Sequence, residues 1–349
     1  MRLVYAGTPD FAVATLEAIH ASRHEIVAVY TQPDRPSGRG QKLRPSAVKQ
    51  AALARNLRLI QVENFKSEAA IEQLRALDAD AMVVVAYGLL LAQAVLDLFP
   101  AGCWNLHASC LPRWRGAAPI ARAIEAGDRE TGVAVMKMEK GLDTGPVLSE
   151  FVLSIGPHDS AQSLQHRLAM HGAGLMVGAL DRLERLRFEP LALAQALKTQ
   201  SADGATYASK LHKSEGLLDF SQPAALLERR MRAFDPVPGC FCWFFPQGAG
   251  EQALVDNPLA RSKAGQMIKC WRGRVHPGLS PGPGPRFGLV VGLGADGPII
   301  ACGEDFLELI EVQQPGGLRV AAMPWAQQTG VKIGDFFAKH ETHGDQELG

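Results

Sequence analysis

The sequence predicts an α/β fold with two domains, an N-terminal domain built on a parallel β-sheet and a C-terminal β-barrel. Three observations support this prediction. Short apolar runs alternate with amphipathic segments through the first half of the chain, as in repeated βαβ units. The final third instead has short strand-like pieces separated by Gly and Pro. The 349 residues also exceed what one compact core commonly needs.

The first expected strand is Arg2–Gly7, an apolar run that ends in glycine as buried parallel strands often do. Thr8 is expected to cap the next helix, with Pro9 at its first position and Asp10 near its positive end. The alternation then repeats. Further strands are expected at residues 25–31, 57–62, 79–88, 103–109 and 131–138. Further helices are expected at residues 46–56, 67–77, 118–127 and 159–186.

The hydrophobic period is lost after the long helix, and we place the domain boundary near Ser201. This gives an N-terminal domain over residues 1–200 and a C-terminal domain over residues 201–349. The second domain has one helical stretch, Ala224–Phe234, followed by short strand-like pieces around the Pro/Gly-rich segment Val275–Gly288. Such a pattern indicates a small β-barrel or sandwich.

Composition limits the class of partner. Lys and Arg together number 36, as do Asp and Glu, so any site for a polyanion must be a local patch. No apolar run has the length of a membrane span or of a signal sequence, which predicts a soluble protein. Cys240 and Cys242 lie close together, but without a second pair nearby they indicate buried free thiols more than a zinc site. We therefore expect a reducing, cytoplasmic setting.

Asn105 and His107 stand two residues apart near the end of a predicted strand, so their side chains share one face. Ser109 would continue that face if the strand persists. Ligands of parallel sheets bind beyond the carboxyl ends of the strands, where the amide and imidazole could donate to a carbonyl oxygen that gains negative charge. The alternative is a polar strand end with its histidine held by a backbone carbonyl.

Asp143 lies between Gly141 and Gly145 in a sharp loop after another strand. By itself this pattern is more often a plain turn, in which the Asp bonds its own backbone. Combined with Asn105 and His107, it suggests direct acyl transfer between two substrates, without a metal or a nucleophilic Ser or Cys. The histidine and aspartate would manage protons, and the amide would stabilise the oxyanion.

The loop at residues 31–49 is basic and rich in Gly and Pro. It is either a solvated surface loop or, since it borders the same sheet edge, a contact for a phosphodiester backbone. Its basic residues are Arg35, Arg39, Lys42, Arg44 and Lys49, against the single acid Asp34. Arg113, Trp114 and Arg115 would add charge and a stacking face. Arg229, Arg230 and Arg232 are equally consistent with nucleic-acid contacts and with a solvated helix face.

Seven stretches resemble the methionyl-tRNA formyltransferase family in order and spacing: AGTPDFA, TQPDRPSGRG, VVVAYGLLL, NLHASCLPRWRGAAPI, GLDTG, TYASKLHKSEGLLDF and RAFDPVPG. The resemblance covers nearly the whole chain, and LPRWRGAAPI is its most specific part. It implies a Rossmann-like formyltransferase domain followed by an OB-like tRNA-binding barrel. It also implies 10-formyltetrahydrofolate as the formyl donor and the amine of methionine on initiator tRNA as the acceptor.

Carried over by motif, Asn105, His107 and Asp143 would be catalytic, with no metal. The resemblance places the folate pocket at Tyr87, Gly88, Leu89, Leu90, Ser109, Cys110, Leu111 and Pro112. The tRNA contacts would be Arg35, Arg39, Lys42, Arg44, Arg113 and Arg115, in a protein that we expect to be monomeric. The chain departs from the family pattern at Ala108, Cys110 and Lys140.

Three other functions agree less well with the sequence. A formyltransferase of the same superfamily that acts on a phosphorylated glycinamide or an amino sugar would need neither the basic loop nor the second domain. A tRNA-binding protein without activity would have no use for Asn105, His107 and Asp143. A dinucleotide-dependent reductase is disfavoured because AGTPDF lacks the G-x-G-x-x-G spacing.

Overall fold

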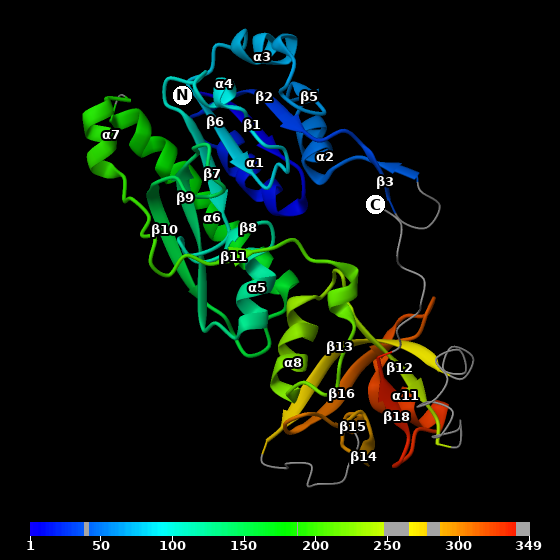
Figure 1. The fold of residues 1–349 in the computed structure, drawn as a ribbon. Helices are drawn as coiled ribbons and strands as arrows, with labels where there is room; N and C mark the ends of the chain where they lie inside the picture. Colours follow the sequence, from blue (N-terminus) through cyan, green and yellow to red (C-terminus); the bar gives the residue numbers. More distant parts are fainter. Residues whose placement is uncertain (38–41, 187, 248–264, 278–286, 340–349) are drawn as a thin grey trace. The chain divides into compact units, whose positions relative to one another are not determined.

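The computed structural model describes residues 1–37, 42–186, 188–247, 265–277 and 287–339, which form two compact units (Figure 1). The first unit consists of Met1–Ile120, Arg129–Ile155 and Ser163–Ser209. The second unit consists of Ala121–Asp128, Gly156–Gln162 and Lys210–Gly349. The boundary near Ser201 stays a prediction about domains, while the contacts of the first unit continue to Ser209.

The first unit is built on a seven-stranded sheet in the order β10-β9-β7-β6-β1-β2-β5. The strands are β1 (Arg2–Gly7), β2 (Glu25–Thr31), β5 (Leu59–Gln61), β6 (Ala81–Val85), β7 (Cys103–His107), β9 (Glu130–Lys137) and β10 (Val147–Ser154). The five strands from β5 to β7 are parallel, which confirms the predicted class. Strands β9 and β10 extend the sheet in the antiparallel sense, so one edge of the sheet is mixed.

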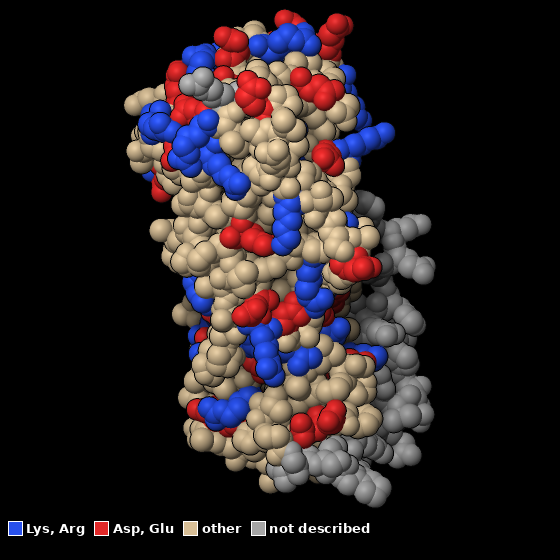
Figure 2. Space-filling model, turned by 90° about the vertical axis from the view of Figure 1, so that its left-hand side faces the viewer, with Lys and Arg blue, Asp and Glu red and all other residues tan. Residues whose placement is uncertain are grey.

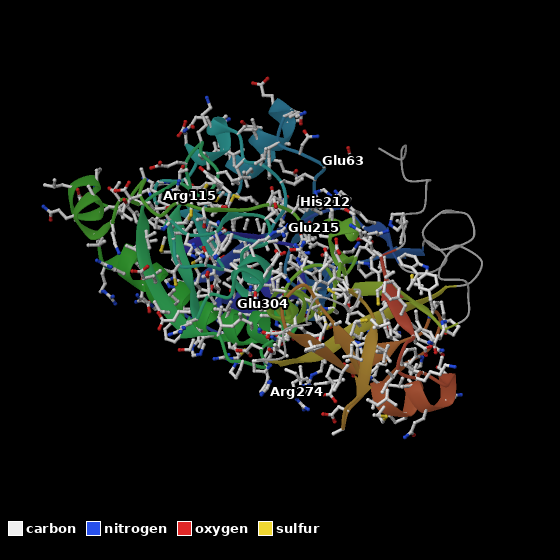
Figure 3. All side chains as sticks on the ribbon, turned by 60° about the horizontal axis from the view of Figure 1, so that its bottom comes forward. Glu63, Arg115, His212, Glu215, Arg274 and Glu304 are labelled. Atoms are coloured by element: carbon white, nitrogen blue, oxygen red, sulfur yellow. The ribbon has the colours of Figure 1, made fainter. Side chains whose placement is uncertain are left out.

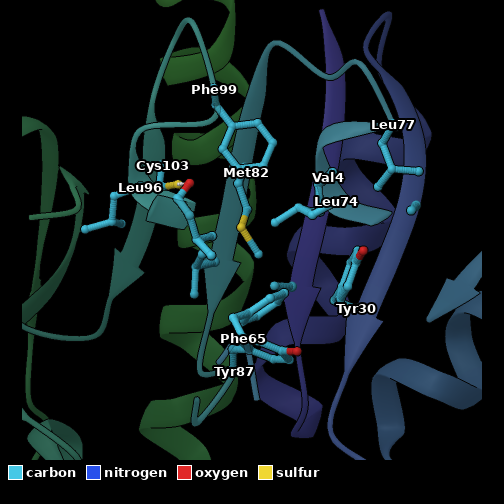
Figure 4. Close-up of a cluster of buried hydrophobic side chains, with 14 residues drawn as sticks. Val4, Tyr30, Phe65, Leu74, Leu77, Met82, Tyr87, Leu96, Phe99 and Cys103 are labelled. Atoms are coloured by element: carbon cyan, nitrogen blue, oxygen red, sulfur yellow. Dashed lines mark hydrogen bonds between the residues drawn. The ribbon is translucent and has the colours of Figure 1, made fainter. Parts of the chain in front are cut away.

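One face of this sheet is covered by a buried apolar cluster (Figure 4). The strands contribute alternate residues, as the two-residue period of a strand requires. These residues are Val4, Ala6, Ala28, Tyr30, Met82, Val84 and Cys103. Phe65, Tyr87 and Phe99 from the connecting segments and Leu74 of α3 (Glu68–Arg75) complete much of the cluster. On the other face, Gly172 of α6 (Ala161–Arg185) meets Leu106 of β7.

Helices α2 (Ala47–Ala54) and α3 begin at the serines that the sequence indicates, whereas the first helix does not begin at Thr8. Ser46 caps α2, and Ser67 caps α3, each through a side-chain oxygen that accepts a backbone N–H. Thr8 does not cap a helix, so that prediction was wrong. Its hydroxyl donates instead to the carbonyl of Tyr87 at 2.9 Å. The chain after it forms the short 3-10 helix η1 (Asp10–Ala12) and then α1 (Val13–His20).

Several elements of the first unit were not predicted. They are the hairpin β3 (Arg35–Ser37) and β4 (Lys42–Arg44), helices α4 (Gln93–Leu96) and α7 (Pro190–Ala196), strand β10, and the paired strands β8 (Arg115–Gly116) and β11 (Tyr207–Ala208). Most are shorter than the window over which a hydrophobic period can be recognised. Helix α5 (Pro119–Ala126), which begins in the first unit and continues in the second, agrees with its prediction.

The second unit contains an antiparallel barrel in the order β14-β15-β16-β13-β12-β18, with β17 beside β16. Its strands are β12 (Cys240–Phe245), β13 (Gln266–His276), β14 (Val290–Leu293), β15 (Pro298–Ala301), β16 (Phe306–Gln313), β17 (Arg319–Ala321) and β18 (Phe336–Ala338). A bridge between Leu289 and Phe336 brings the two ends of the sheet together. The predicted C-terminal barrel is therefore confirmed.

The described helices of the second unit are η2 (Lys213–Gly216), α8 (Ala224–Ala233) and α11 (Ala322–Thr329), together with α5 from Ala121 onward. Aromatic contacts among Phe244, Trp325 and Phe337 form part of the barrel core. Cys240 and Cys242 are buried free thiols, as predicted. Burial opposes ionisation of Glu308, but hydrogen bonds from the backbone of Asp296 and from His276 hold its pKa below the usual range.

No helix in the described ranges is long and apolar enough to cross a membrane.

Candidate active site

Asn105 and His107 lie at the carboxyl end of β7, which pairs with β6 on one side and with β9 on the other. The strand ends at His107, so Ser109 does not continue the face as the sequence suggested. The Ser109 side chain is buried, and its hydroxyl donates to the carbonyl of Arg113 at 2.6 Å. The strand alternation thus positions the amide and the imidazole, while Ser109 helps to hold the bend that follows.

Asp143 is the point at which the predicted residues meet. Its Oδ1 accepts a hydrogen bond from Asn105 Nδ2 at 3.3 Å. Its Oδ2 accepts from the backbone N–H of Gly116 at 2.8 Å and lies 3.7 Å from His107 Nδ1. The structure therefore brings the three predicted side chains together from two separate segments.

The loop that carries Asp143 has a specific shape. Asp143 itself has a φ of 51°, in the left-handed region that most residues avoid. A Cβ at Gly145 would stand 1.8 Å from the carbonyl oxygen of Lys137, so no side chain is tolerated there. The second glycine of the G-x-D-x-G pattern thus permits the close packing that turns Asp143 toward β7.

The imidazole of His107 is held from two sides. Its Nε2 lies 2.8 Å from the carbonyl oxygen of Trp114, and because a carbonyl only accepts, this nitrogen carries a hydrogen. Its Nδ1 faces Asp143. The His107 side chain is 6% exposed and that of Asp143 14%, so the pair acts in surroundings where water screens charge poorly.

Gln200 and Arg115 complete the support of this site (Arg115 is labelled in Figure 3). Gln200 Nε2 donates to the carbonyls of Asp143 and Gly145, and its Oε1 accepts from the guanidinium of Arg115. Sequence reasoning missed Gln200, which lies in a stretch without periodicity. No local signal identifies it, because its partners are 55 and 57 residues away along the chain.

The turn after β6 was predicted to line the folate pocket. The Tyr87 ring is buried in the core near Phe65, so only its main chain can face a ligand. Its carbonyl accepts hydrogen bonds from Thr8 and Gln32, both at 2.9 Å. Gly88 has a φ of 79°, Leu89 packs against the core cluster, and Leu90 is 89% exposed.

The segment after β7 was predicted to line the same pocket. A Cβ added to Gly132 of β9 would lie 2.7 Å from Cys110 Sγ, so the thiol packs closely on that strand. Leu111 is buried in a cluster with Ala134, Met136 and Val147. Pro112 is half-buried and follows a cis peptide bond. These side chains mainly fix the path of the segment.

The predicted basic loop forms the hairpin of β3 and β4, in which Arg35 and Arg44 are cross-strand partners and both are exposed. At its base, Lys49 binds Asp34 at 2.8 Å, and this hydrogen bond lowers the pKa of Asp34. The acid of the loop is thereby paired within the loop. Arg39 lies outside the described residues, and of Lys42 only the backbone is described.

The other predicted tRNA contacts lie in different surroundings. The guanidinium of Arg113 stacks on the Trp114 ring, 4.6 Å from its centroid. Arg115 is 8% exposed and holds Gln200, which differs from the exposed position expected of a phosphate contact. In the second unit, the three α8 arginines bind groups of that unit. Arg229 binds the carbonyl of Glu125, Arg230 its carboxylate, and Arg232 the carboxylate of Glu228.

Among the described residues, no group of three or more His, Cys, Asp or Glu side chains is arranged to hold a metal ion.

The fold and the site define a formyl transferase. A family described as "Formyl transferase" matches residues 1–180, and "Formyl transferase, C-terminal domain" matches residues 210–330. A methionyl-tRNA formyltransferase of Burkholderia pseudomallei is 45% identical over 346 residues, with 97% of each chain covered. One of Xanthomonas axonopodis is 48% identical over 322 residues, with 92% of this chain and 95% of that one covered. The chain belongs to the methionyl-tRNA formyltransferase family.

Solved structures share the fold at low sequence identity. The sugar 3N-formyl transferase WlaRD is 15% identical, with a TM-score of 0.57, and the match covers 88% of this chain and 97% of that one. HypX from Aquifex aeolicus is 12% identical, with a TM-score of 0.55, over all of this chain and 50% of the other. The first was solved with 5-N-formyl-THF and the second with tetrahydrofolic acid.

Proposed function

We propose that this chain transfers the formyl group of 10-formyltetrahydrofolate to the amino group of methionine on initiator methionyl-tRNA, for translation initiation. Relatives that match nearly the whole chain carry the name of this activity. The observation that carries the proposal within the structure is the convergence of Asn105, His107 and Asp143 at the carboxyl end of β7.

The reaction needs little from the protein beyond hydrogen bonds and proton transfer. The amine nitrogen forms a bond to the formyl carbon, whose oxygen becomes negatively charged. The Asn105 amide has two N–H donors, of which one reaches Asp143 and the other can serve this oxygen. Such donors lower the barrier because they meet charge that develops only in the transition state.

Protons must also move. The attacking amine loses a proton, and the folate nitrogen gains one as its bond to the formyl carbon breaks. His107 and Asp143 lie together and mostly buried, which suits a pair that accepts the first proton and supplies the second. Asp143 also orients the imidazole, whose other nitrogen is already fixed by the Trp114 carbonyl.

We assign the folate to the turn at residues 87–90 and the segment at residues 109–112. They follow β6 and β7, which are neighbours in the sheet, so both reach the same edge. The exposed Leu90 offers apolar surface to a flat ring, whereas Tyr87 can contribute only main-chain groups. The remaining N–H of the Asn105 amide suits the carbonyl oxygen of a formyl group.

We assign tRNA binding to the β3–β4 hairpin and to Arg113. Arg35 and Arg44 are exposed, and Lys49 pairs with the single acid of the loop. Arg39 and Lys42 are included in this proposal because they belong to the same basic stretch of the sequence. Arg115 is buried and binds Gln200, so it is not included among the proposed tRNA contacts.

The assay uses methionyl-tRNA and 10-formyltetrahydrofolate labelled in the formyl group, with glycinamide ribonucleotide as a competing acceptor. We expect label in the tRNA fraction and none in the small acceptor. Label in the glycinamide product alone would favour the small-acceptor formyltransferase. A protein that binds tRNA but transfers no label to either acceptor would favour the non-catalytic alternative.

A further inference from the structure

Gln200 uses its whole side-chain amide on three neighbours. Its Nε2 donates to the carbonyls of Asp143 at 2.8 Å and Gly145 at 2.7 Å. Its Oε1 accepts from Arg115 Nε at 3.0 Å and Nη2 at 2.8 Å. We propose that Gln200, braced by Arg115, is a positioning residue that fixes the Asp143 carboxylate for formyl transfer. This inference rests on the proposed function.

Asp143 needs such support because its backbone conformation is unfavourable. A non-glycine residue in the left-handed region is strained and persists only where its surroundings hold it. The carboxylate is held by Asn105 and by the N–H of Gly116. Gln200 holds the carbonyl of the same residue. Contacts at both ends of Asp143 therefore define its orientation.

Arg115 ties this support to the rest of the site. It lies in β8, where its backbone N–H donates to the carbonyl of Thr206 at 2.9 Å. The residue before it supplies the carbonyl that holds His107, and the residue after it supplies the N–H that holds Asp143. The Trp114–Gly116 segment thus contacts both catalytic groups directly, and it reaches the Asp143 carbonyl through Gln200.

The main chain of Gln200 is fixed as well. Lys198, two residues earlier, exchanges two backbone hydrogen bonds with Val147, at 2.8 and 2.9 Å. This bridge holds the 198–200 segment beside the end of the Asp143 loop, so the side chain reaches both carbonyls. The guanidinium bonded to Oε1 also polarises the amide, which strengthens its two N–H donors.

The test is Gln200→Glu, which keeps the shape of the side chain. The carboxylate still pairs with Arg115 but has no N–H for the carbonyls of Asp143 and Gly145, and it repels them. If Gln200 only stabilised the fold, a Gln200→Glu variant that remains folded would keep the wild-type kcat. The positioning role predicts a kcat about 100-fold lower, the effect of misplacing a reacting group by about 1 Å. The KM values for both substrates should remain unchanged.

The matched control is Gln73→Glu, the same change at an exposed glutamine of α3. Thermal unfolding of every variant establishes that it is folded. If Gln200→Glu does not fold, Gln200→Met removes the same hydrogen bonds without adding a charge, and Arg115→Lys removes the two-pronged contact with Oε1. Wild-type kcat in a folded Gln200 variant, or a loss confined to KM, would overturn the inference. Absence of formyl transfer by the wild-type chain would instead reject the proposed function.

Discussion

At the scale of the residue, the site depends on the position of the Asp143 carboxylate. The carboxylate accepts a hydrogen bond from Asn105 and lies beside His107. It also accepts the N–H of Gly116, so the same side chain holds the β8 segment as well as the imidazole. Loss of its charge should therefore affect the chemical step more than the binding of substrates.

We predict that Asp143→Asn lowers kcat for formyl transfer by about 10²–10⁴-fold, the usual contribution of a positioned acid or base. The Kd for tRNA should stay close to that of the wild type, as it should for His107→Ala. Single-turnover rates and tRNA binding measured on the same preparations separate the two effects. Asp203→Asn, at an exposed acid of the same unit, is the control. A matching loss of tRNA affinity would place Asp143 in recognition instead.

At the scale of the element, helix α6 packs against β7, the strand that carries Asn105 and His107. A Cβ at Gly172 would stand 2.7 Å from Cδ2 of Leu106, which lies between Asn105 and His107 in β7. Leu106 is buried, so it has little room to move. A Cβ at Gly174 would meet nothing within 4 Å. The same helix thus offers one glycine required by packing and one that is not.

We predict that Gly174→Ala raises the free energy of unfolding by up to about 1 kcal/mol, the gain in helix propensity. Gly172→Ala should show less gain or a loss, since Leu106 must shift, and its kcat should fall while that of Gly174→Ala does not. Chemical denaturation and formylation kinetics of the two variants provide the comparison. Equal stability and equal kcat would show that the contact with Leu106 is unimportant.

At the scale of the whole molecule, charge is balanced. Basic and acidic residues are equal in number, and on the face in Figure 2 the two kinds are interspersed. Many arginines bind acids of their own unit, including Arg230 and Arg232 of α8. Binding of a polyanion must therefore come from exposed cations such as Arg35 and Arg44.

We predict that the affinity for tRNA falls steeply with salt, because each phosphate contact releases counterions. Replacing Arg35 and Arg44 together with alanine should reduce the slope of log K against log salt by about one for each lost contact. Binding titrations at several KCl concentrations measure this slope. Arg75→Ala, at an exposed arginine of α3 that pairs with Glu72, is the control and should leave the slope unchanged. A wild-type affinity that is independent of salt would contradict the prediction.

The sequence by itself determined the alternation of strands and helices, the C-terminal barrel, and the placement of Asn105 and His107 at a strand end. These features follow from periods of two and 3.6 residues and from glycine, proline and serine at turns and caps, all of which act over short distances along the chain. The prediction that Thr8 caps a helix was wrong because its hydroxyl donates to the carbonyl of Tyr87, 79 residues away.

Only the tertiary structure decided that Asp143 reaches both Asn105 and His107, that Arg115 is buried, and that Gln200 binds the loop that carries Asp143. It also decided that the Tyr87 ring is buried in the core cluster of the first unit. The physical reason is that hydrogen bonds between distant segments depend on how loops close and pack. A polar residue in an irregular stretch carries no local pattern from which its partner can be read.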